Sequence, residues 1–227
     1  MSGVPTVRAV LFDFGGVILS SPFEAFAHYE ADRGLPHGFI RSVNAADHHT
    51  NAWARLERSE VDIDGFVEAF EHEASALGHE LDGRAVLSLL AGDLRPEMAI
   101  AIERISDAGL LLGLLTNNVA GLGGVGHGTP RSGPGDRAPK GTDPVEAVLA
   151  RFDLVVESSK VGVRKPDPAF YERACEGLGI EPTEAVFLDD LGVNLKPARA
   201  MGMRTIKVID PAVALAELEV VVGFPLT

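Results

Sequence analysis

The stretch RAVLFDFGGVIL, residues Arg8–Leu19, predicts where a buried strand ends and a binding site begins. Its apolar run Ala9–Phe12 has the length of a strand and is closed abruptly by Asp13 and the pair Gly15–Gly16. An apolar run bounded in this way is typical of a buried strand in a parallel sheet. Asp13 then lies at the carboxyl end of the strand, where open α/β sheets bind their ligands. A carboxylate there can be a nucleophile or a metal ligand, and an Asp that only ends a strand in a turn is the alternative.

The composition is that of an ordinary globular protein with a strongly acidic balance. The chain has 227 residues, of which 46% are hydrophobic and 23% charged, so it has room for one core plus a smaller appended domain. A net charge of −13 argues against nucleic acid or an anionic membrane as a partner, because both attract Lys and Arg. Cys175 is the single cysteine, and the first ten residues do not have the pattern of a signal peptide. We therefore expect a cytoplasmic protein, either a monomer or a homodimer.

Residues 20–92 change from a strand-like to a helical pattern. Phe66, Ala69, Phe70 and Leu77 recur at helical spacing, with Asp62 or Asp64 suited to begin that helix and Gly78 to end it. We expect three to five helices here, inserted as a cap domain over the carboxyl edge of a sheet. The core domain then comprises residues 1–19 and 93–227.

The run Asp47–His48–His49 in this helical stretch invites a metal-site interpretation. Adjacent positions on a helix point in different directions, however, so we favour a solvated helix surface over a metal site.

After the helical stretch the pattern alternates between helix and strand. We expect helices over Pro96–Ala108, from Pro168 to about Gly179, over Lys196–Ala200 and after Pro211, and strands over Leu110–Leu115, Phe152–Glu157, Ala185–Leu188 and Arg204–Val208. This alternation predicts a doubly wound parallel sheet of the Rossmann-like type.

Residues 121–144 interrupt this alternation with a segment dense in Gly and Pro. Such a composition buries too little apolar surface to offset the entropy of ordering, so we expect a flexible loop. It contains no phosphate-binding signature of the G-x-x-x-x-G-K-[ST] type.

Polar residues follow three of the other expected strands. They are Thr116, Asn117 and Asn118 after one strand, Lys165 in the loop after the next, and Asp189 and Asp190 after a third, with Asn194 close behind. The carboxyl ends of parallel strands share one edge of the sheet, so we expect these side chains to converge with Asp13. Adjacent carboxylates repel each other unless a cation lies beside them, and Mg²⁺ prefers such oxygen ligands.

These segments together resemble the haloacid dehalogenase superfamily, most of whose members are phosphatases. The resemblance rests on VLFDFGGVI, LLTNN, the lysine of VRKPDP, and FLDDLGVNLKPA. More narrowly, residues 152–208 resemble the phosphatase-like N-terminal domain of soluble epoxide hydrolases and the related domain of an acyl-CoA dehydrogenase family member. The resemblance implies a superfamily-type α/β core with an inserted helical cap.

The resemblance also implies a role for each residue. Asp13 would attack phosphorus to form an aspartyl-phosphate, and Lys165 would stabilise the developing charge. Mg²⁺ would be bound by Asp13, the carbonyl of Gly15 and Asp190, with Asp189 adjacent. Thr116 and Asn117 would hold the phosphoryl oxygens of a small phosphorylated metabolite. The remaining residues expected at the substrate site are Gly16, Asn118 and Asn194, the last orienting the carboxylates.

One position departs from the pattern of active phosphatases, which usually carry a second Asp two residues after the nucleophile. This chain has Gly15 there, and loss of a positioned acid/base costs about 10²–10⁴-fold in rate. We therefore expect a phosphatase whose turnover Gly15 would slow, with Asp47, His48 and His49 as candidates for a replacement acid.

Two alternatives remain. A catalytically weak phosphate-metabolite binding or regulatory protein is favoured by Gly15. A 2-haloacid dehalogenase, which uses an Asp nucleophile without metal, ranks last because such enzymes lack the Asp–Asp pair.

Overall fold

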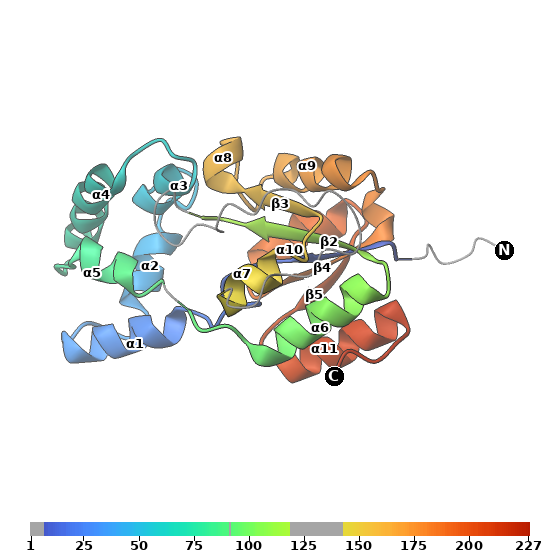
Figure 1. Ribbon diagram of the computed structural model, residues 1–227. Coiled ribbons are helices and arrows are strands. Elements are labelled where there is room, and N and C mark those ends of the chain that lie inside the picture. The colour runs from blue at the N-terminus through green and yellow to red at the C-terminus, as the bar shows by residue number, and fades with distance from the viewer. Residues whose placement is uncertain (1–6, 91, 119–142) are drawn as a thin grey trace.

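Five parallel strands form the sheet at the centre of the protein, and Figure 1 shows helices on both of its faces. The computed structural model describes residues 7–90, 92–118 and 143–227. The strands are β1 (Ala9–Phe12), β2 (Leu111–Thr116), β3 (Leu154–Glu157), β4 (Ala185–Asp189) and β5 (Arg204–Lys207). They lie in the order β3-β2-β1-β4-β5, and every neighbouring pair is parallel. The predicted doubly wound parallel sheet is confirmed.

Alternate residues of each strand supply two separate hydrophobic layers, because successive side chains of a strand point to opposite faces. On β1, Val10 and Phe12 face one layer, and Ala9 and Leu11 face the other. The first layer is completed by α6 (Pro96–Asp107), α7 (Pro144–Leu149) and α11 (Pro211–Val222). The second is completed by α9 (Pro168–Leu178) and α10 (Gly192–Ala200). Helices on both faces explain why the central strands β2, β1 and β4 are apolar up to their carboxyl ends.

A block of five helices lies beyond the carboxyl ends of the strands, and we call residues 20–92 the helical block (Figure 1). Its helices are α1 (Phe23–Asp32), α2 (Phe39–Ala45), α3 (Ala52–Glu57), α4 (Ile63–Ala76) and α5 (Gly83–Ser88). The block has its own hydrophobic cluster, with Trp53, Phe66 and Phe70 at its centre. The rings of Trp53 and Phe66 lie 4.8 Å apart, and Phe70 stacks on Phe66 at 5.1 Å. Asp62 begins α4, as predicted, by accepting a hydrogen bond from the amide of Gly65.

The chain enters and leaves the helical block at one place, directly after β1. The amide of Ser20 donates to the carbonyl of Asp93 at 2.8 Å, and the amide of Arg95 donates to the carbonyl of Ile18 at 2.9 Å. Leu19 and Leu94 form an antiparallel bridge between these bonds. The two linkers are therefore paired with each other, next to Asp13.

Several boundaries differ from the sequence prediction. α10 begins at Gly192 and not near Lys196, because Pro197 within it masks the helical pattern. α8 (Ser158–Val161) is a helix of four residues within an expected loop, too short to show a period. Asp143 and Pro144, expected in the flexible loop, instead begin α7, and the rest of that loop up to residue 142 lies outside the described residues.

The prediction that Asp47, His48 and His49 lie on a helix is also wrong. They form a turn between α2 and α3, and Asp47 has a φ of 48°. A left-handed residue cannot continue a right-handed helix, which explains the break.

No helix in the part of the chain that the structure describes is long and apolar enough to cross a membrane.

Removing a ring from the centre of the helical block tests its hydrophobic cluster. We expect Phe66→Ala to lower the free energy of unfolding by about 3–5 kcal/mol, because the fully buried ring leaves a cavity among Trp53 and Phe70. Urea denaturation measures this. The control is Ile209→Ala at a side chain 80% exposed, for which we expect a change within about 0.5 kcal/mol. Equal changes in the free energy of unfolding of the two variants would contradict the placement of Phe66 at the centre of this cluster.

Candidate active site

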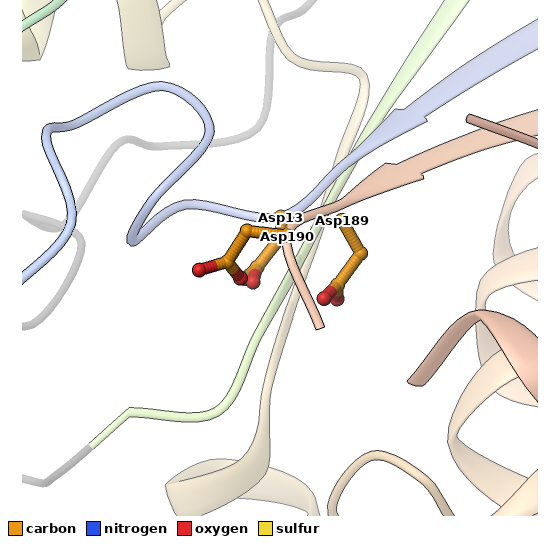
Figure 2. Close-up of side chains that lie close together, drawn as sticks. All are labelled: Asp13, Asp189 and Asp190. Atoms are coloured by element: carbon orange, nitrogen blue, oxygen red, sulfur yellow. The ribbon is translucent and has the colours of Figure 1, made fainter. Parts of the chain in front are cut away.

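Three carboxylates and one ammonium group converge at the carboxyl edge of the sheet. Asp13 directly follows β1, Asp189 ends the neighbouring β4, and Asp190 comes next. The amide of Asp13 donates to the carbonyl of Leu188 at 2.9 Å and so extends the pairing of β1 with β4. Figure 2 shows the three acidic side chains leaving these adjacent strand ends toward the same side. Lys165, from the segment after β3, reaches the same point.

The ammonium of Lys165 lies between two carboxylates. Its Nζ is 2.8 Å from Oδ1 of Asp13 and 2.8 Å from Oδ2 of Asp189, and the residue is only 1% exposed. Burial alone lowers the pKa of a lysine, but Asp13 and Asp189 outweigh it, so the pKa of Lys165 is raised. Lys165 is therefore a permanent cation in contact with Asp13.

Asp189 is fully buried, and both of its oxygens are occupied. Besides Lys165, it accepts hydrogen bonds from Nδ2 of Asn194, 3.0 Å from each oxygen, and from the amide of Leu191 at 2.8 Å. Tyr171 donates its hydroxyl to the carbonyl of Asn194 at 2.7 Å and so supports the start of α10. Asp189 orients Lys165, and Asn194 orients Asp189.

Asp13 keeps one oxygen free. Its Oδ1 accepts from the amide of Phe14 at 2.7 Å and contacts Lys165, whereas Oδ2 has no partner among the described residues. Burial raises the pKa of Asp13 well above its usual value, and Asp189 and Asp190 add to the effect, which Lys165 offsets only in part.

The negative charge of this cluster exceeds the positive charge. Asp13, Asp189 and Asp190 each place a carboxylate oxygen within 4.8 Å of the others, and when all three are ionised the single ammonium leaves two negative charges unbalanced. The pKa of Asp190 is raised to about 6, first by burial and then by Asp189. Hard oxygen ligands with an excess of two charges suit a divalent cation.

The two glycines that follow Asp13 and Phe14 have different surroundings. Gly16 has a φ of 81°, and a Cβ there would lie 2.7 Å from Cγ of Asp190. A Cβ on Gly15 would meet no atom of the described residues within 4 Å, and the φ of Gly15 is outside the left-handed region. Gly16 is therefore required for the close approach of Asp190, whereas the described part of the chain leaves space for a side chain at Gly15.

The asparagines after β2 hold the backbone of the neighbouring segment. The side chain of Asn117 accepts from the amide of Lys165 at 2.9 Å and donates to its carbonyl at 3.0 Å. Asn118 binds Glu157 through Nδ2 at 2.7 Å and the amide and hydroxyl of Ser159 through Oδ1. Both amides are thus engaged within the protein, which the sequence does not reveal. Thr116 is buried at the end of β2.

Comparisons with known proteins agree with this geometry. A family model described as haloacid dehalogenase-like hydrolase matches residues 7–202. Acyl-CoA dehydrogenase family member 10 of Mus musculus is 35% identical over 99% of this chain and 20% of its own length. Bifunctional epoxide hydrolase 2 of Sus scrofa is 30% identical over 97% of this chain and 40% of its length. The chain belongs to the haloacid dehalogenase-like hydrolases, and it spans less than half the length of these two relatives.

Two further proteins match over most of their own length. Validoxylamine A 7'-phosphate phosphatase of Streptomyces hygroscopicus subsp. limoneus is 30% identical over 78% of this chain and 86% of its own. A haloacid dehalogenase family enzyme of Bacteroides thetaiotaomicron, solved in complex with magnesium and inorganic phosphate, superposes with a TM-score of 0.55. It is 15% identical, over 88% of this chain and 93% of its own, which shows a shared fold.

Substitution of the two glycines tests the metal geometry. We expect Gly16→Ala to weaken binding of a divalent cation by about 10–100-fold, because the new methyl group displaces the carboxylate of Asp190. Gly15→Ala adds the same group in open space and serves as the matched control, with affinity within about threefold of the unchanged protein. Isothermal titration with Mg²⁺ measures both. A similar loss in both variants would contradict the close approach of Asp190 as the cause.

Proposed function

We propose that the protein is an Mg²⁺-dependent phosphatase acting on a small organic phosphate. The observation that carries this proposal is the buried Lys165 ammonium 2.8 Å from Asp13, with Asp189 and Asp190 alongside. An anionic nucleophile that must approach an anionic phosphate needs such neutralising groups. Relatives that are named as phosphatases support this reaction class.

Asp13 is the proposed nucleophile. Its free Oδ2 attacks phosphorus, the bond from phosphorus to the leaving oxygen breaks, and an aspartyl-phosphate forms. Lys165 and the amide of Phe14 hold Oδ1, so the carboxylate keeps one orientation during attack. The Lys165 ammonium stabilises charge that develops near Asp13. Water then attacks the phosphoryl group, which releases phosphate and restores the carboxylate.

Asp13, Asp190 and the carbonyl of Gly15 are the proposed ligands of Mg²⁺. The unbalanced charge of the three carboxylates and the Cβ-free approach at Gly16 both fit such an ion. When bound, Mg²⁺ would screen repulsion between Asp13 and the phosphate. Asp189 is proposed to act indirectly, since its oxygens are taken by Lys165, Asn194 and Leu191.

Asn117 is proposed to position Lys165 rather than to bind phosphate with its side-chain amide, since both ends of that amide hold the Lys165 backbone. We assign the phosphoryl oxygens instead to Lys165, the hydroxyl of Thr116 and the backbone beside Gly15 and Gly16. The helical block is proposed to be the cap that selects the leaving group, because it lies over the carboxyl ends of the strands (Figure 1).

A panel of phosphate esters tests the reaction. We expect phosphate release with Mg²⁺ and none with EDTA. Asp13→Asn keeps the shape of the side chain but removes the nucleophile, and we expect it to abolish turnover. Phosphate release that is unchanged by Asp13→Asn would contradict the proposed nucleophile.

Gly15→Asp tests the missing acid. A Cβ at this position meets no described atom within 4 Å, and we expect kcat on alkyl phosphates to rise by about 10²-fold or more, because their alkoxide leaving group needs a proton. p-Nitrophenyl phosphate, whose leaving group needs no proton, is the control substrate and should gain much less. An equal gain on both substrates would contradict an acid role at this position.

The second candidate is a phosphate-metabolite binding or regulatory protein, and the absence of an acid at Gly15 favours it. No turnover by the unchanged protein, together with activity in Gly15→Asp, would establish this alternative.

A further inference from the structure

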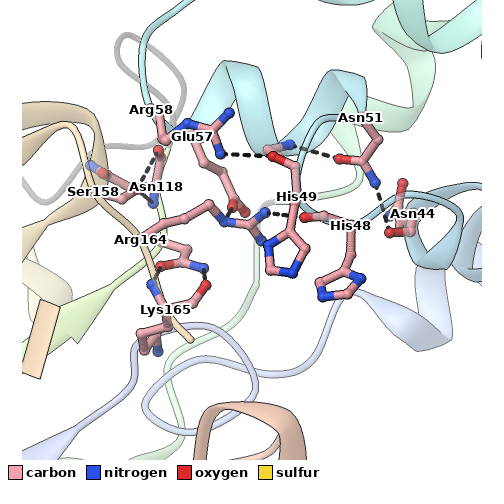
Figure 3. A network of polar contacts seen from close by, with 12 residues as sticks. Asn44, His48, His49, Asn51, Glu57, Arg58, Asn118, Ser158, Arg164 and Lys165 are labelled. Carbon is pink, nitrogen blue, oxygen red and sulfur yellow. Dashed lines mark hydrogen bonds and ion pairs between the residues drawn. The ribbon is translucent and has the colours of Figure 1, made fainter. Parts of the chain in front are cut away.

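Arg164 joins the sheet to the helical block at the residue directly before Lys165. Its Nε lies 2.5 Å from Oε2 of Glu57, at the end of α3, although the N–H is not aligned for a hydrogen bond. Its Nη1 donates to the carbonyl of His48 at 3.1 Å. The two charged side chains are only 21% and 15% exposed. Figure 3 shows Arg164 lying between the active-site segment and the helical block.

The loop that contains His48 and His49 is bound by two arginine side chains, Arg164 and Arg58. Arg58 donates through Nη1 to the carbonyl of His49 at 3.1 Å, so two guanidinium groups hold consecutive carbonyls. The imidazole rings of His48 and His49 lie 4.0 Å apart, and their nitrogens have no hydrogen-bond partner among the described residues. Two guanidinium contacts therefore hold the backbone of this loop, and its two imidazole side chains are exposed.

Arg164 is also tied to the catalytic centre that we propose. The next residue, Lys165, has its amide and carbonyl bound by Asn117 and its ammonium bound by Asp13. A second contact lies nearby, where the hydroxyl of Ser59 donates to the carbonyl of Ser159 at 3.0 Å. The segment that places Lys165 is thus the same segment on which the helical block rests.

An arginine suits this junction better than a lysine. A guanidinium can contact the carboxylate of Glu57 and the carbonyl of His48 at once, which a single ammonium cannot do with the same geometry. A buried ion pair contributes little net stability because both charges lose hydration, but it favours one arrangement of the parts it joins. Burial raises the pKa of Glu57, and the positive charges of Arg164 and then Lys165 counteract this shift. The carboxylate of Glu57 therefore also interacts electrostatically with the ammonium of Lys165.

We propose that Arg164 is a positioning residue, which holds the helical block over Asp13 through Glu57 and the carbonyl of His48. This placement puts the loop of His48 and His49 on the side of the substrate's leaving group. The inference rests on the proposed phosphatase function. It goes further by naming the contact that sets how the organic part of the substrate is held.

The test separates binding of the organic part from binding of phosphate. The variants are Arg164→Gln, Glu57→Gln, the double variant and Arg164→Lys. Arg151→Gln is the matched control, because it removes a half-buried arginine that pairs with two acidic side chains of the core. For each protein, kcat and KM are measured on the best ester of the panel. The Kd of inorganic phosphate is measured with Mg²⁺ present.

We expect Arg164→Gln and Glu57→Gln each to lower kcat/KM for the ester by about tenfold, mainly through KM. The Kd of inorganic phosphate should stay within about twofold, because phosphate alone does not reach the helical block. The double variant leaves no unpaired buried charge and should be no worse than either single variant. Arg164→Lys should recover activity only in part, and Arg151→Gln should match the unchanged protein.

Three outcomes would overturn the proposal. Equal losses for ester and inorganic phosphate would mean that Arg164 acts on Lys165 itself. Additive losses in the double variant would mean that Glu57 and Arg164 do not act as a pair, and no loss would mean that the contact positions nothing.

Hydrogen exchange of the segment 47–59 keeps this test separate from that of the phosphatase itself. Even if no ester is hydrolysed, exchange there should become faster in Arg164→Gln and Glu57→Gln and stay unchanged in Arg151→Gln. Unchanged exchange in all variants, with intact thermal unfolding, would also overturn the proposal.

Discussion

The buried ammonium of Lys165 between Asp13 and Asp189 is the interaction on which the rest of the site depends. A lysine that is 1% exposed persists as a cation only with such partners, and the two carboxylates in turn need the lysine. The arrangement fixes one oxygen of Asp13 and leaves the other free. When all three carboxylates are ionised, the cluster carries two more negative than positive charges. The same three carboxylates, whose burial is unfavourable, are therefore a suitable site for a divalent cation.

The scaffold around this interaction consists of side chains whose polar groups are bound within the protein. Asn117 holds the backbone of Lys165, and Asn194 holds the oxygens of Asp189, with Tyr171 bonded to the carbonyl of Asn194. Groups that only orient a reactive residue are needed because small displacements cost rate. The contact through Arg164 extends this principle to the helical block, since it continues the segment that Asn117 holds.

The ends of β1, β2 and β4 were predictable from sequence because each of these strands is an apolar run that stops abruptly at a polar residue. Asp13, Asp189 and Asp190 follow two such runs on adjacent strands, and Asp62, one of the two residues expected to begin α4, is its N-cap. Short or interrupted helices were not predictable. α8 has only four residues, and the proline inside α10 hides its first turn.

The binding partner of a polar side chain could not be predicted from the sequence either. An asparagine at a strand end is the same residue type whether its amide binds an anion or a backbone 48 positions away, as Asn117 does. The contact of Arg164 with Glu57 likewise joins residues far apart in the chain. Such pairings depend on how the helical block packs against the sheet, which no local pattern encodes.

The most direct test of Asp13 as the nucleophile is peptide mass mapping after an acid quench during turnover of a phosphate ester. Acid preserves an acyl phosphate, so an intermediate that forms during turnover survives the quench. We expect one phosphoryl group on the peptide that contains Asp13, and none on the same peptide of Asp13→Asn. Phosphate release with no phosphoryl group on that peptide at any quench time would contradict Asp13 as the nucleophile.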